Sequence, residues 1–392
     1  MRIRFIGAGL HLLSGSGKPL YQLVDNLRKN NIDVNMLSDN LDNSVLSVQS
    51  LLLQKNQLNH VEAERTENIT YGLLKGNKTV ILAIKKFIRN ADVIVTSDFL
   101  LALLLKKRGL TAKIPVVFIA SNNLDFRLRF LIQAGLISTV NIFKRSFYSK
   151  LIFNRRFALR YILSFFDHII TTSNFVADFL VKLKLTVPIL YLPVGINISS
   201  TSTSVPLPKN TFLYFGWGSG IRGLQDVIKA FELYKSSGHL GTLRISLQGY
   251  HGYEERCYFN RIKKSAFFDS IELGYFDENI RETILSSKAV ILPFRVPFGY
   301  SQPPLAILES MALRRTVIST KIGCIPEIIT HEKDGFLVTP GNPQEITDIL
   351  VRLSDATAIQ IGSNAYEKIK EIYDWDVVIK KYVQLFEKIV ER

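Results

Sequence analysis

The chain has 392 residues and 47% hydrophobic composition, which predicts two domains of ordinary size, each able to bury a core. Its two cysteines, Cys257 and Cys324, lie far apart without metal-ligand spacing, which excludes a disulfide scaffold and favours a reduced, cytosolic setting. The first residues predict a strand rather than a signal peptide, and no stretch approaches the ~20 apolar residues that span a bilayer, so we expect a soluble or peripheral protein with a net charge of +15.

Short apolar runs alternate with amphipathic stretches through the first half of the chain. Strands are predicted there at Arg2–Ile6, Asp33–Leu37, Val93–Thr96, Val116–Ala120 and His168–Thr172. Helices are predicted at Leu20–Lys29, Lys78–Ile88 and Leu100–Lys107. Strands that alternate with helices are typical of a parallel α/β sheet.

Basic and aromatic residues concentrate between Phe126 and Phe166, where eight Lys or Arg and ten Phe or Tyr occur without one Asp or Glu. An apolar helical face is predicted from the spacing of Phe143, Phe147, Leu151, Ala158, Tyr161 and Phe165. The cations off that face, which we expect to contact a membrane, are Lys144, Arg145, Arg155, Arg156 and Arg160. The pattern favours an anionic lipid surface over a core helix with a solvated basic face. Nucleic acid is not predicted as a partner, because no recognised nucleic-acid motif accompanies the segment.

The second half repeats the α/β pattern after a polar, proline-containing linker at Ser199–Pro208. Strands are predicted at Thr211–Phe215, Leu243–Gln248, Ser270–Leu273, Ala289–Leu292, Val317–Ser319 and Phe336–Val338. Helices are predicted at Gly223–Lys235, Glu254–Lys264, Ile280–Ser286, Leu305–Leu313, Ile325–Ile329, Gln344–Ser354 and Ala356–Ile372. Each half should therefore contain its own parallel sheet.

Glycine turns after strands are the places where such sheets bind phosphates. Gly15 and Gly17 precede the first helix, in a loop that we expect to face an interdomain cleft. The stronger signal is the turn after the first strand of the second half, where Gly216 and Gly223 permit close backbone approach. Arg222 in this turn can donate paired hydrogen bonds to phosphate oxygens at a helix start. The alternative is a flexible loop with a solvated arginine, and the position at a strand–helix junction favours phosphate binding.

The segment from Pro297 to Ala312 predicts a nucleotide site. A glycine turn leads into Ser301 and Gln302, and the two prolines that follow are expected to open a helix. The N–H groups at such a start form an anion site. Glu309, expected two turns inside the helix, can accept the paired hydroxyls of a ribose. This arrangement predicts binding of a sugar nucleotide.

These motifs together resemble the retaining glycosyltransferases of family 4, which have the GT-B fold. The resemblance covers most of the chain and rests on Gly216 with Arg222-Gly223, Leu192–Asn197, Ile271–Tyr275, Ala289–Pro293, Gly323–Glu327, Asp334–Val338 and Tyr373–Trp375. It implies two Rossmann-like parallel-sheet domains that face a cleft. These are an acceptor-binding domain at 1–198, a nucleotide-sugar-binding domain at 199–372, and a helix at 373–392 that packs back on the first domain.

The chain also departs from the family pattern. The family carries two glutamates eight positions apart, of which Glu309 matches the second and implies contact with the ribose, whereas Ser301 stands at the first. Trp217 stands where the family usually has an arginine beside the phosphate, and no histidine occurs near Ser121. The expected catalytic residues are Arg222, Ser301 and Glu309. The expected donor-binding residues are Gly15, Gly17, Gly216, Gly223, Gln302 and Leu305.

The resemblance implies a glycosyltransferase that moves a hexose-type sugar from a nucleoside-diphosphate sugar to an acceptor with retention of configuration. No cofactor is expected, and no metal is needed if Arg222 supplies the counter-charge. The basic segment further predicts that the acceptor is lipid-linked or a growing glycan, as in polysaccharide or glycolipid biosynthesis. It also predicts that the protein lies peripherally on the inner face of the membrane. Two alternatives stay open: a non-catalytic GT-B protein that binds nucleotide or a partner, and an isomerase or phosphorylase of the same fold.

Overall fold

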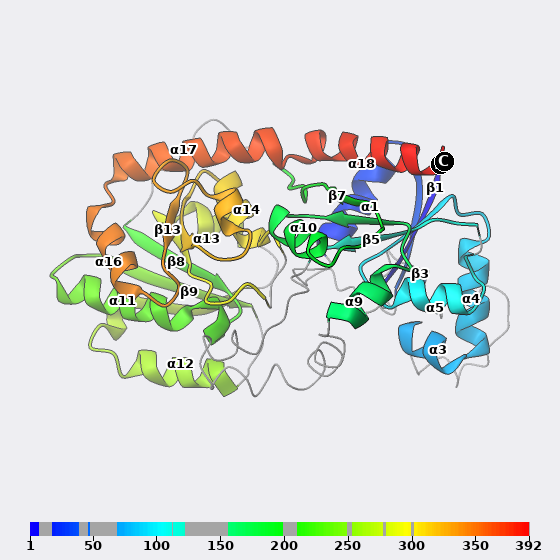
Figure 1. The fold of residues 1–392 in the computed structure, drawn as a ribbon. Coiled ribbons are helices and arrows are strands. Elements are labelled where there is room, and N and C mark those ends of the chain that lie inside the picture. The colour runs from blue at the N-terminus through cyan, green and yellow to red at the C-terminus, as the bar shows by residue number, and fades with distance from the viewer. Residues whose placement is uncertain are drawn as a thin grey trace. The chain divides into compact units, whose positions relative to one another are not determined.

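The computed structural model describes residues 1–7, 18–38, 46–47, 69–111, 113–121, 156–198, 210–248, 253–276, 280–298 and 302–391 (Figure 1). The described residues form two compact units. The first comprises Met1–Leu124, Phe153–Gly195 and Trp375–Arg392, and the second comprises Ile196–Asp374, each counted over the residues just given.

The first unit is built on a sheet with the strand order β3-β2-β1-β4-β5-β6-β7, and its neighbouring strands are parallel. The strands are β1 (Arg2–Gly7), β2 (Asp33–Ser38), β3 (Leu46–Ser47), β4 (Val93–Thr96), β5 (Val116–Ala120), β6 (His168–Thr171) and β7 (Ile189–Tyr191). Successive side chains of a strand point to opposite faces. In β4, for instance, Ile94 belongs to one apolar cluster, while Val93 and Val95 belong to the other.

Helices cover both faces of this sheet. The cluster that contains Val93 and Val95 is closed by α1 (Lys18–Lys29) and α18 (Trp375–Val390). The opposite cluster is closed by α3 (Ile69–Lys75), α4 (Lys78–Ile88), α5 (Leu101–Lys107), α9 (Arg156–Leu163) and α10 (Asn174–Val181). The last helix of the chain, red in Figure 1, thus packs on the first domain, which confirms that prediction.

The second unit contains a sheet with the strand order β10-β9-β8-β11-β12-β13, again with parallel neighbours. The strands are β8 (Thr211–Gly216), β9 (Thr242–Gln248), β10 (Ile271–Phe276), β11 (Ala289–Leu292), β12 (Thr316–Thr320) and β13 (Phe336–Val338). The helices are α11 (Leu224–Ser236), α12 (Tyr253–Lys263), α13 (Arg281–Leu285), α14 (Leu305–Ala312), α15 (Ile325–Ile328), α16 (Pro343–Arg352) and α17 (Asp355–Ile372), with single 3₁₀ turns at η3 (Gly220–Arg222) and η4 (Phe268–Ser270).

Two parallel α/β sheets with Rossmann-like order confirm the predicted fold class, and every predicted strand is present. The sequence pattern missed four elements, namely β3, β7, α3 and α10. Each is short, and β7 at the sheet edge is only partly buried, so it lacks the continuous apolar run of a central strand. The predicted linker at Ser199–Pro208 and the loop with Gly15 and Gly17 lie outside the described residues.

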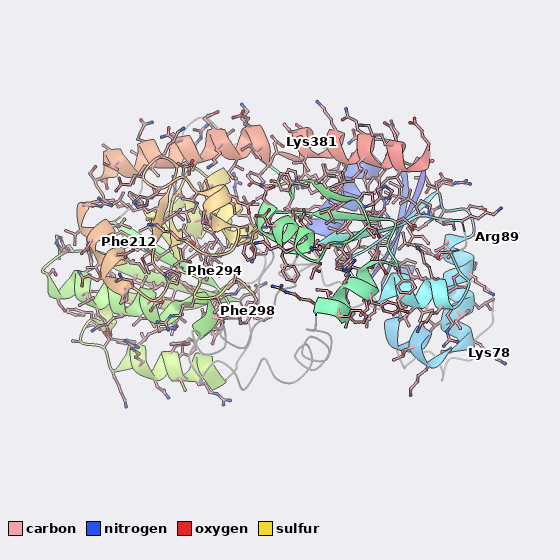
Figure 2. All side chains as sticks on the ribbon, viewed as in Figure 1. Lys78, Arg89, Phe212, Phe294, Phe298 and Lys381 are labelled. Atoms are coloured by element: carbon pink, nitrogen blue, oxygen red, sulfur yellow. The ribbon has the colours of Figure 1, made fainter. Side chains whose placement is uncertain are left out.

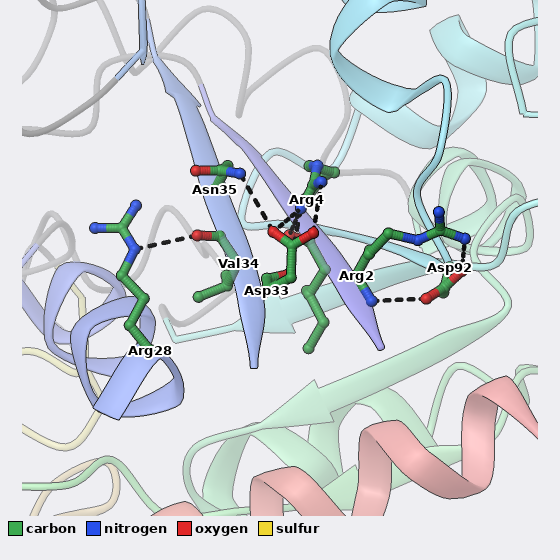
Figure 3. A network of polar contacts seen from close by, with 8 residues as sticks. Arg2, Arg4, Arg28, Asp33, Val34, Asn35 and Asp92 are labelled. Atoms are coloured by element: carbon green, nitrogen blue, oxygen red, sulfur yellow. Dashed lines mark hydrogen bonds and ion pairs between the residues drawn. The ribbon is translucent and has the colours of Figure 1, made fainter. Parts of the chain in front are cut away.

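Ion pairs join strands at the amino edge of the first sheet (Figure 3). The Arg2 Nη2 donates to Asp92 Oδ1 at 2.9 Å, and Arg4 donates to both oxygens of Asp33 at 3.0 and 3.2 Å. The hydrogen bond from Arg2 holds the pKa of the Asp92 carboxyl below its usual range. Parallel sheets bind ligands at their carboxyl edge, so these pairs stabilise the fold rather than form a site.

Candidate functional site

The strand order of the second unit locates a candidate site before any side chain is considered. From β8 the chain continues to β9 on one side, whereas β11 pairs with β8 on the other side. In open parallel sheets, ligands bind outside the carboxyl ends of the strands at such a switch point. The loops that follow β8 and β11 therefore form the candidate site.

The loop after β8 is shaped by two glycines. Gly216 has a φ of +120° and Gly223 a φ of +77°, both in the region that side chains disfavour. A Cβ on Gly223 would lie 2.0 Å from the Pro293 carbonyl oxygen, in the loop after β11. Glycine at this position thus lets the two loops at the switch point touch, and α11 begins at the next residue.

Arg222 is placed directly beside this contact. Its guanidinium carbon lies 5.8 Å from the centre of the Trp217 ring and 5.7 Å from that of Phe294, which is labelled in Figure 2. Its Nη1 would lie 3.6 Å from a Cβ on Gly216, so the guanidinium lies over the end of β8. The structure therefore holds a half-buried cation at the switch point, one residue before the contact glycine.

Polar contacts fix the loop around this cation. The Tyr214 hydroxyl donates to the Trp217 carbonyl at 2.6 Å, and the Trp217 Nε1 donates to Gln248 Oε1 at 3.1 Å. Burial raises the pKa of Tyr214 well above its usual range, so its hydroxyl stays a neutral donor. On the other side of the loop, Gln225 donates to the Gly220 carbonyl at 3.2 Å.

A second arginine nearby is neutralised by a carboxylate. Arg295 donates to Asp226 Oδ2 at 2.8 Å and to Oδ1 at 2.5 Å, and the Asp226 side chain is almost fully buried in the first turn of α11. The hydrogen bond to Asp226 raises the pKa of Arg295 above its usual value. The backbone N–H of Arg295 donates to the Ile221 carbonyl at 2.9 Å, so this pair anchors the turn that carries Arg222.

The structure corrects one detail of the segment before α14. The helix begins at Leu305, after both prolines, and Glu309 is its fifth residue, little more than one turn inside rather than two. The prolines fix the approach to the helix, because Pro304 has an extended backbone that a first-turn residue lacks. Glu309 itself is half-buried.

Gln302 has a positioning role that the sequence did not indicate. Its side chain is fully buried, its Nε2 donates to the Pro297 carbonyl at 3.3 Å, and its Oε1 accepts the Cys324 backbone N–H at 3.2 Å. A Cβ on Gly323 would lie 3.0 Å from that oxygen. The amide thus ties the approach to α14 to the start of α15.

The structure brings together Gly216, Arg222 and Gly223, and it places Gln302, Leu305 and Glu309 at and before α14. The remaining predicted positions, Gly15, Gly17, Ser301, Lys144, Arg145 and Arg155, lie outside the described residues. Sequence reasoning missed the contact of Phe294 with Arg222 and the pair of Asp226 with Arg295, which join positions about 70 residues apart.

The basic segment is described from Arg156 onward, where it forms α9. Its buried face is Leu159, Ile162 and Leu163; of the residues predicted to form an apolar face, Tyr161 is exposed, whereas Ala158 and Phe165 are partly buried. The opposite face exposes Arg156 and Arg160 together with two aromatic rings, Phe157 at 82% exposure and Tyr161 at 52%. None of the described helices is long and apolar enough to cross a bilayer.

Metal-binding side chains do not gather in the described parts of the chain, where no group of three or more His, Cys, Asp or Glu stands in ligating distance. Arg222 and the backbone N–H groups at the start of α11 bring positive charge to the candidate site.

Family models match both halves of the chain. Residues 13–200 match the model described as Glycosyltransferase Family 4, and residues 209–356 match Glycosyl transferases group 1. With the two-sheet fold, these matches support a group 1 glycosyltransferase of the GT-B type. The candidate site lies within the second matched region.

Curated relatives match parts of the chain. It is 27% identical over 122 residues to the MMP alpha-(1->4)-mannosyltransferase of Mycolicibacterium hassiacum, which covers 30% of the chain and 29% of the relative. It is 25% identical over 174 residues to the amylovoran biosynthesis glycosyltransferase AmsK of Erwinia amylovora, which covers 43% of the chain and 42% of the relative. The chain thus matches less than half the length of either relative.

Solved structures match the whole chain in fold. The sucrose-phosphate synthase of Thermosynechococcus elongatus aligns with a TM-score of 0.72 at 16% identity, over 99% of both chains. The Anabaena protein HepE in complex with UDP aligns with a TM-score of 0.72 at 14% identity, over 99% of this chain and 100% of that one. At these identities the likeness establishes the GT-B fold alone.

Proposed function

We propose that the chain is a retaining glycosyltransferase that moves a hexose-type sugar from a nucleoside-diphosphate sugar to an acceptor. The observation that carries the proposal is the half-buried Arg222, held at the switch point of the second sheet directly before a helix start. A permanent cation and helix N–H groups at one place suit the diphosphate of a sugar nucleotide. HepE, a neighbour in fold, has been solved with UDP-glucose, so UDP is the first nucleotide to test.

The chemistry needs little from the protein beyond placed charge. Cleavage of the anomeric C–O bond leaves positive charge on the sugar and negative charge on the departing nucleoside diphosphate. Arg222 and the N–H groups at the start of α11 stabilise that negative charge where it develops, so no metal ion is required. Glu309 binds the ribose hydroxyls, and Ser301 hydrogen-bonds the transferred sugar. Retention of configuration follows from the family resemblance.

The replacement of Arg222 by alanine tests this proposal. A hydrogen bond to a charged group contributes about 1.5–3 kcal/mol, so Arg222→Ala should weaken UDP or GDP binding by about tenfold to a hundredfold. Isothermal titration calorimetry measures the affinity, and turnover is followed with a panel of sugar nucleotides. The control is Lys229→Ala, which removes one exposed charge from α11 and should change neither.

Equal nucleotide affinity in Arg222→Ala and the wild type would remove the arginine from the donor site. Nucleotide binding by the wild type without turnover of any sugar nucleotide would instead favour the non-catalytic alternative, a GT-B protein that binds nucleotide or a partner.

We further propose that the acceptor is lipid-linked or a growing glycan, and that the protein binds peripherally to the cytoplasmic face of the membrane through α9. Support comes from its exposed face, which carries Arg156 and Arg160 beside Phe157 and Tyr161. Cations attract anionic head groups, and exposed aromatic rings favour the interface between head groups and acyl chains.

Vesicle co-sedimentation tests the membrane proposal. Each cation near an anionic surface contributes about 1 kcal/mol, so changing both Arg156 and Arg160 to Glu should lower affinity for anionic vesicles at least tenfold. The matched control changes Lys380 and Lys381 to Glu, two exposed cations on α18 whose neighbouring aromatic ring, Tyr382, is buried in the core. Wild-type binding should weaken but persist as salt rises, because ring insertion is not screened. If the wild type ignores anionic vesicles, a soluble acceptor replaces the lipid-linked one.

A further inference from the structure

Trp217 is a half-exposed ring in a fixed orientation at the carboxyl end of β8. Its side chain is 52% exposed, although tryptophan burial is usually favourable. The Tyr214 hydroxyl donates a hydrogen bond to the Trp217 carbonyl, and the Gln248 side chain accepts one from the Trp217 indole N–H. The ring therefore keeps its place while half of its surface faces solvent.

Arg222 lies within reach of this ring and of a second, buried one. Its guanidinium carbon is 5.8 Å from the Trp217 centroid and 5.7 Å from the centroid of Phe294, which is 1% exposed. A guanidinium within about 6 Å of a ring centroid is attracted by the negative face of the ring. The two rings follow β8 and β11, the neighbouring strands at the switch point, so the sheet itself sets their spacing.

The two arginines near the switch point are held by different chemistry. Arg295 is bound by the Asp226 carboxylate, which cancels its charge. Arg222 contacts two rings that carry no net charge, Trp217 and Phe294. A cation in a half-buried place attracts an anion more strongly than one in bulk water, because the local dielectric constant is lower.

We propose that Trp217 is a positioning residue, whose indole ring holds the Arg222 guanidinium, together with Phe294, in the orientation that meets the donor diphosphate. This inference rests on the proposed function of the site and adds to it the residue that orients its cation. An unrestrained arginine samples many rotamers and loses that freedom on binding. The aromatic ring removes part of this cost before the nucleotide arrives.

A mutant cycle isolates the contribution of the ring. Trp217→Phe and Trp217→Leu both lose the indole hydrogen bond to Gln248, but only phenylalanine keeps an aromatic face toward Arg222. UDP and GDP affinities are measured by calorimetry for both variants, in the wild-type background and in Arg222→Met. In the wild-type background, Trp217→Leu should bind the nucleotide about three- to tenfold more weakly than Trp217→Phe. In the Arg222→Met background the two variants should be equal.

Intrinsic fluorescence supplies a second readout in the unmodified protein. The chain has two tryptophans, and the other one, Trp375, is buried in the first unit. Titration with UDP or GDP should change the emission of the wild type through Trp217, and Trp217→Phe should abolish the change. Because Trp217 is half-exposed, these variants are expected to fold, which thermal unfolding verifies.

The outcomes separate the inference from the function on which it rests. Equal affinities of the Leu and Phe variants in the wild-type background overturn the positioning role while leaving the donor site in place. A Leu-to-Phe difference that persists in Arg222→Met also overturns it, because the ring would then act without the arginine. If the wild type binds neither UDP nor GDP, the proposed function and the inference both fail.

Discussion

Gly223→Ala is expected to destabilise the second unit by about 2–5 kcal/mol and to abolish measurable donor binding. An L-residue at positive φ costs about 1–2 kcal/mol, and forcing extra atoms into a filled space costs about 1–3 kcal/mol more. At Gly223 the φ is +77° and the added Cβ would meet the Pro293 carbonyl oxygen at 2.0 Å. Relief of that contact requires the loop after β8 to move, and Arg222 moves with it.

The chain offers a control that separates backbone strain from the clash. Gly238 has a φ of +84°, and a Cβ there would meet nothing within 4 Å. Gly238→Ala should therefore cost only the strain, about 1–2 kcal/mol, and leave nucleotide affinity unchanged. Urea unfolding and calorimetry with UDP measure both quantities. Equal destabilisation by the two substitutions would contradict the contact between the loops after β8 and β11.

The sequence predicted the central strands because a buried strand appears in the sequence as a short continuous run of apolar residues. β4, β5 and β11 occur at the predicted residues, and each is a run of consecutive buried residues with a clear start and end. The helix α10 was missed although Ser173 caps it by accepting the Val176 N–H, since one capping residue is a weaker signal than a periodic apolar stripe.

The helix α9 shows that local spacing alone does not decide which residues of a helix are buried. Several sets of residues in an aromatic-rich helix satisfy a period of 3.6, and the sheet decides which set is buried. Leu159, Ile162 and Leu163 are buried in the core, and Tyr161 is exposed. Branched aliphatic side chains fill the space over a strand layer, whereas the longer tyrosine keeps its hydroxyl end in water.

The sequence predicted which turn forms the candidate site, but it did not predict the contacts of that turn with residues far away in the chain. Gly216, Arg222 and Gly223 lie in one turn, and a glycine-rich strand–helix junction is a local signal for phosphate binding. The ring of Phe294 reaches Arg222 only because β8 and β11 pair in the sheet. No spacing along the chain encodes that pairing.

Of the ion pairs near the site, the pair of Arg295 and Asp226 should contribute most to the free energy of unfolding. Arg295→Met leaves the Asp226 carboxylate buried without its partner, and such a loss costs about 3–5 kcal/mol. Asp226→Asn should cost less, because the Arg295 side chain retains 23% exposure and reaches water, whereas that of Asp226 retains 4%. The free energy of unfolding from urea denaturation distinguishes the two variants.

An exposed pair of the same chemistry provides the control. Arg352 lies 2.7 Å from Glu332, with both side chains about half exposed, so Arg352→Met should cost at most about 1 kcal/mol. The double variant Asp226→Asn with Arg295→Met should lose less than the sum of the single losses, because neither charge is then left alone. Additive losses, or equal losses for Arg295→Met and Arg352→Met, would show that burial does not set the strength of the pair.

The same variants connect this pair to the donor site. The Arg295 backbone N–H donates to the Ile221 carbonyl, one residue before Arg222, so the ion pair holds the strand end against the turn that carries the cation. Arg295→Met should therefore weaken UDP binding as well as lower stability, although it leaves Arg222 chemically intact. Under conditions where both proteins are folded, as circular dichroism verifies, we expect a loss of several-fold in affinity that Arg352→Met does not share. Unchanged affinity in folded Arg295→Met would mean that the Arg222 turn holds its shape through Gly223 and the aromatic rings alone.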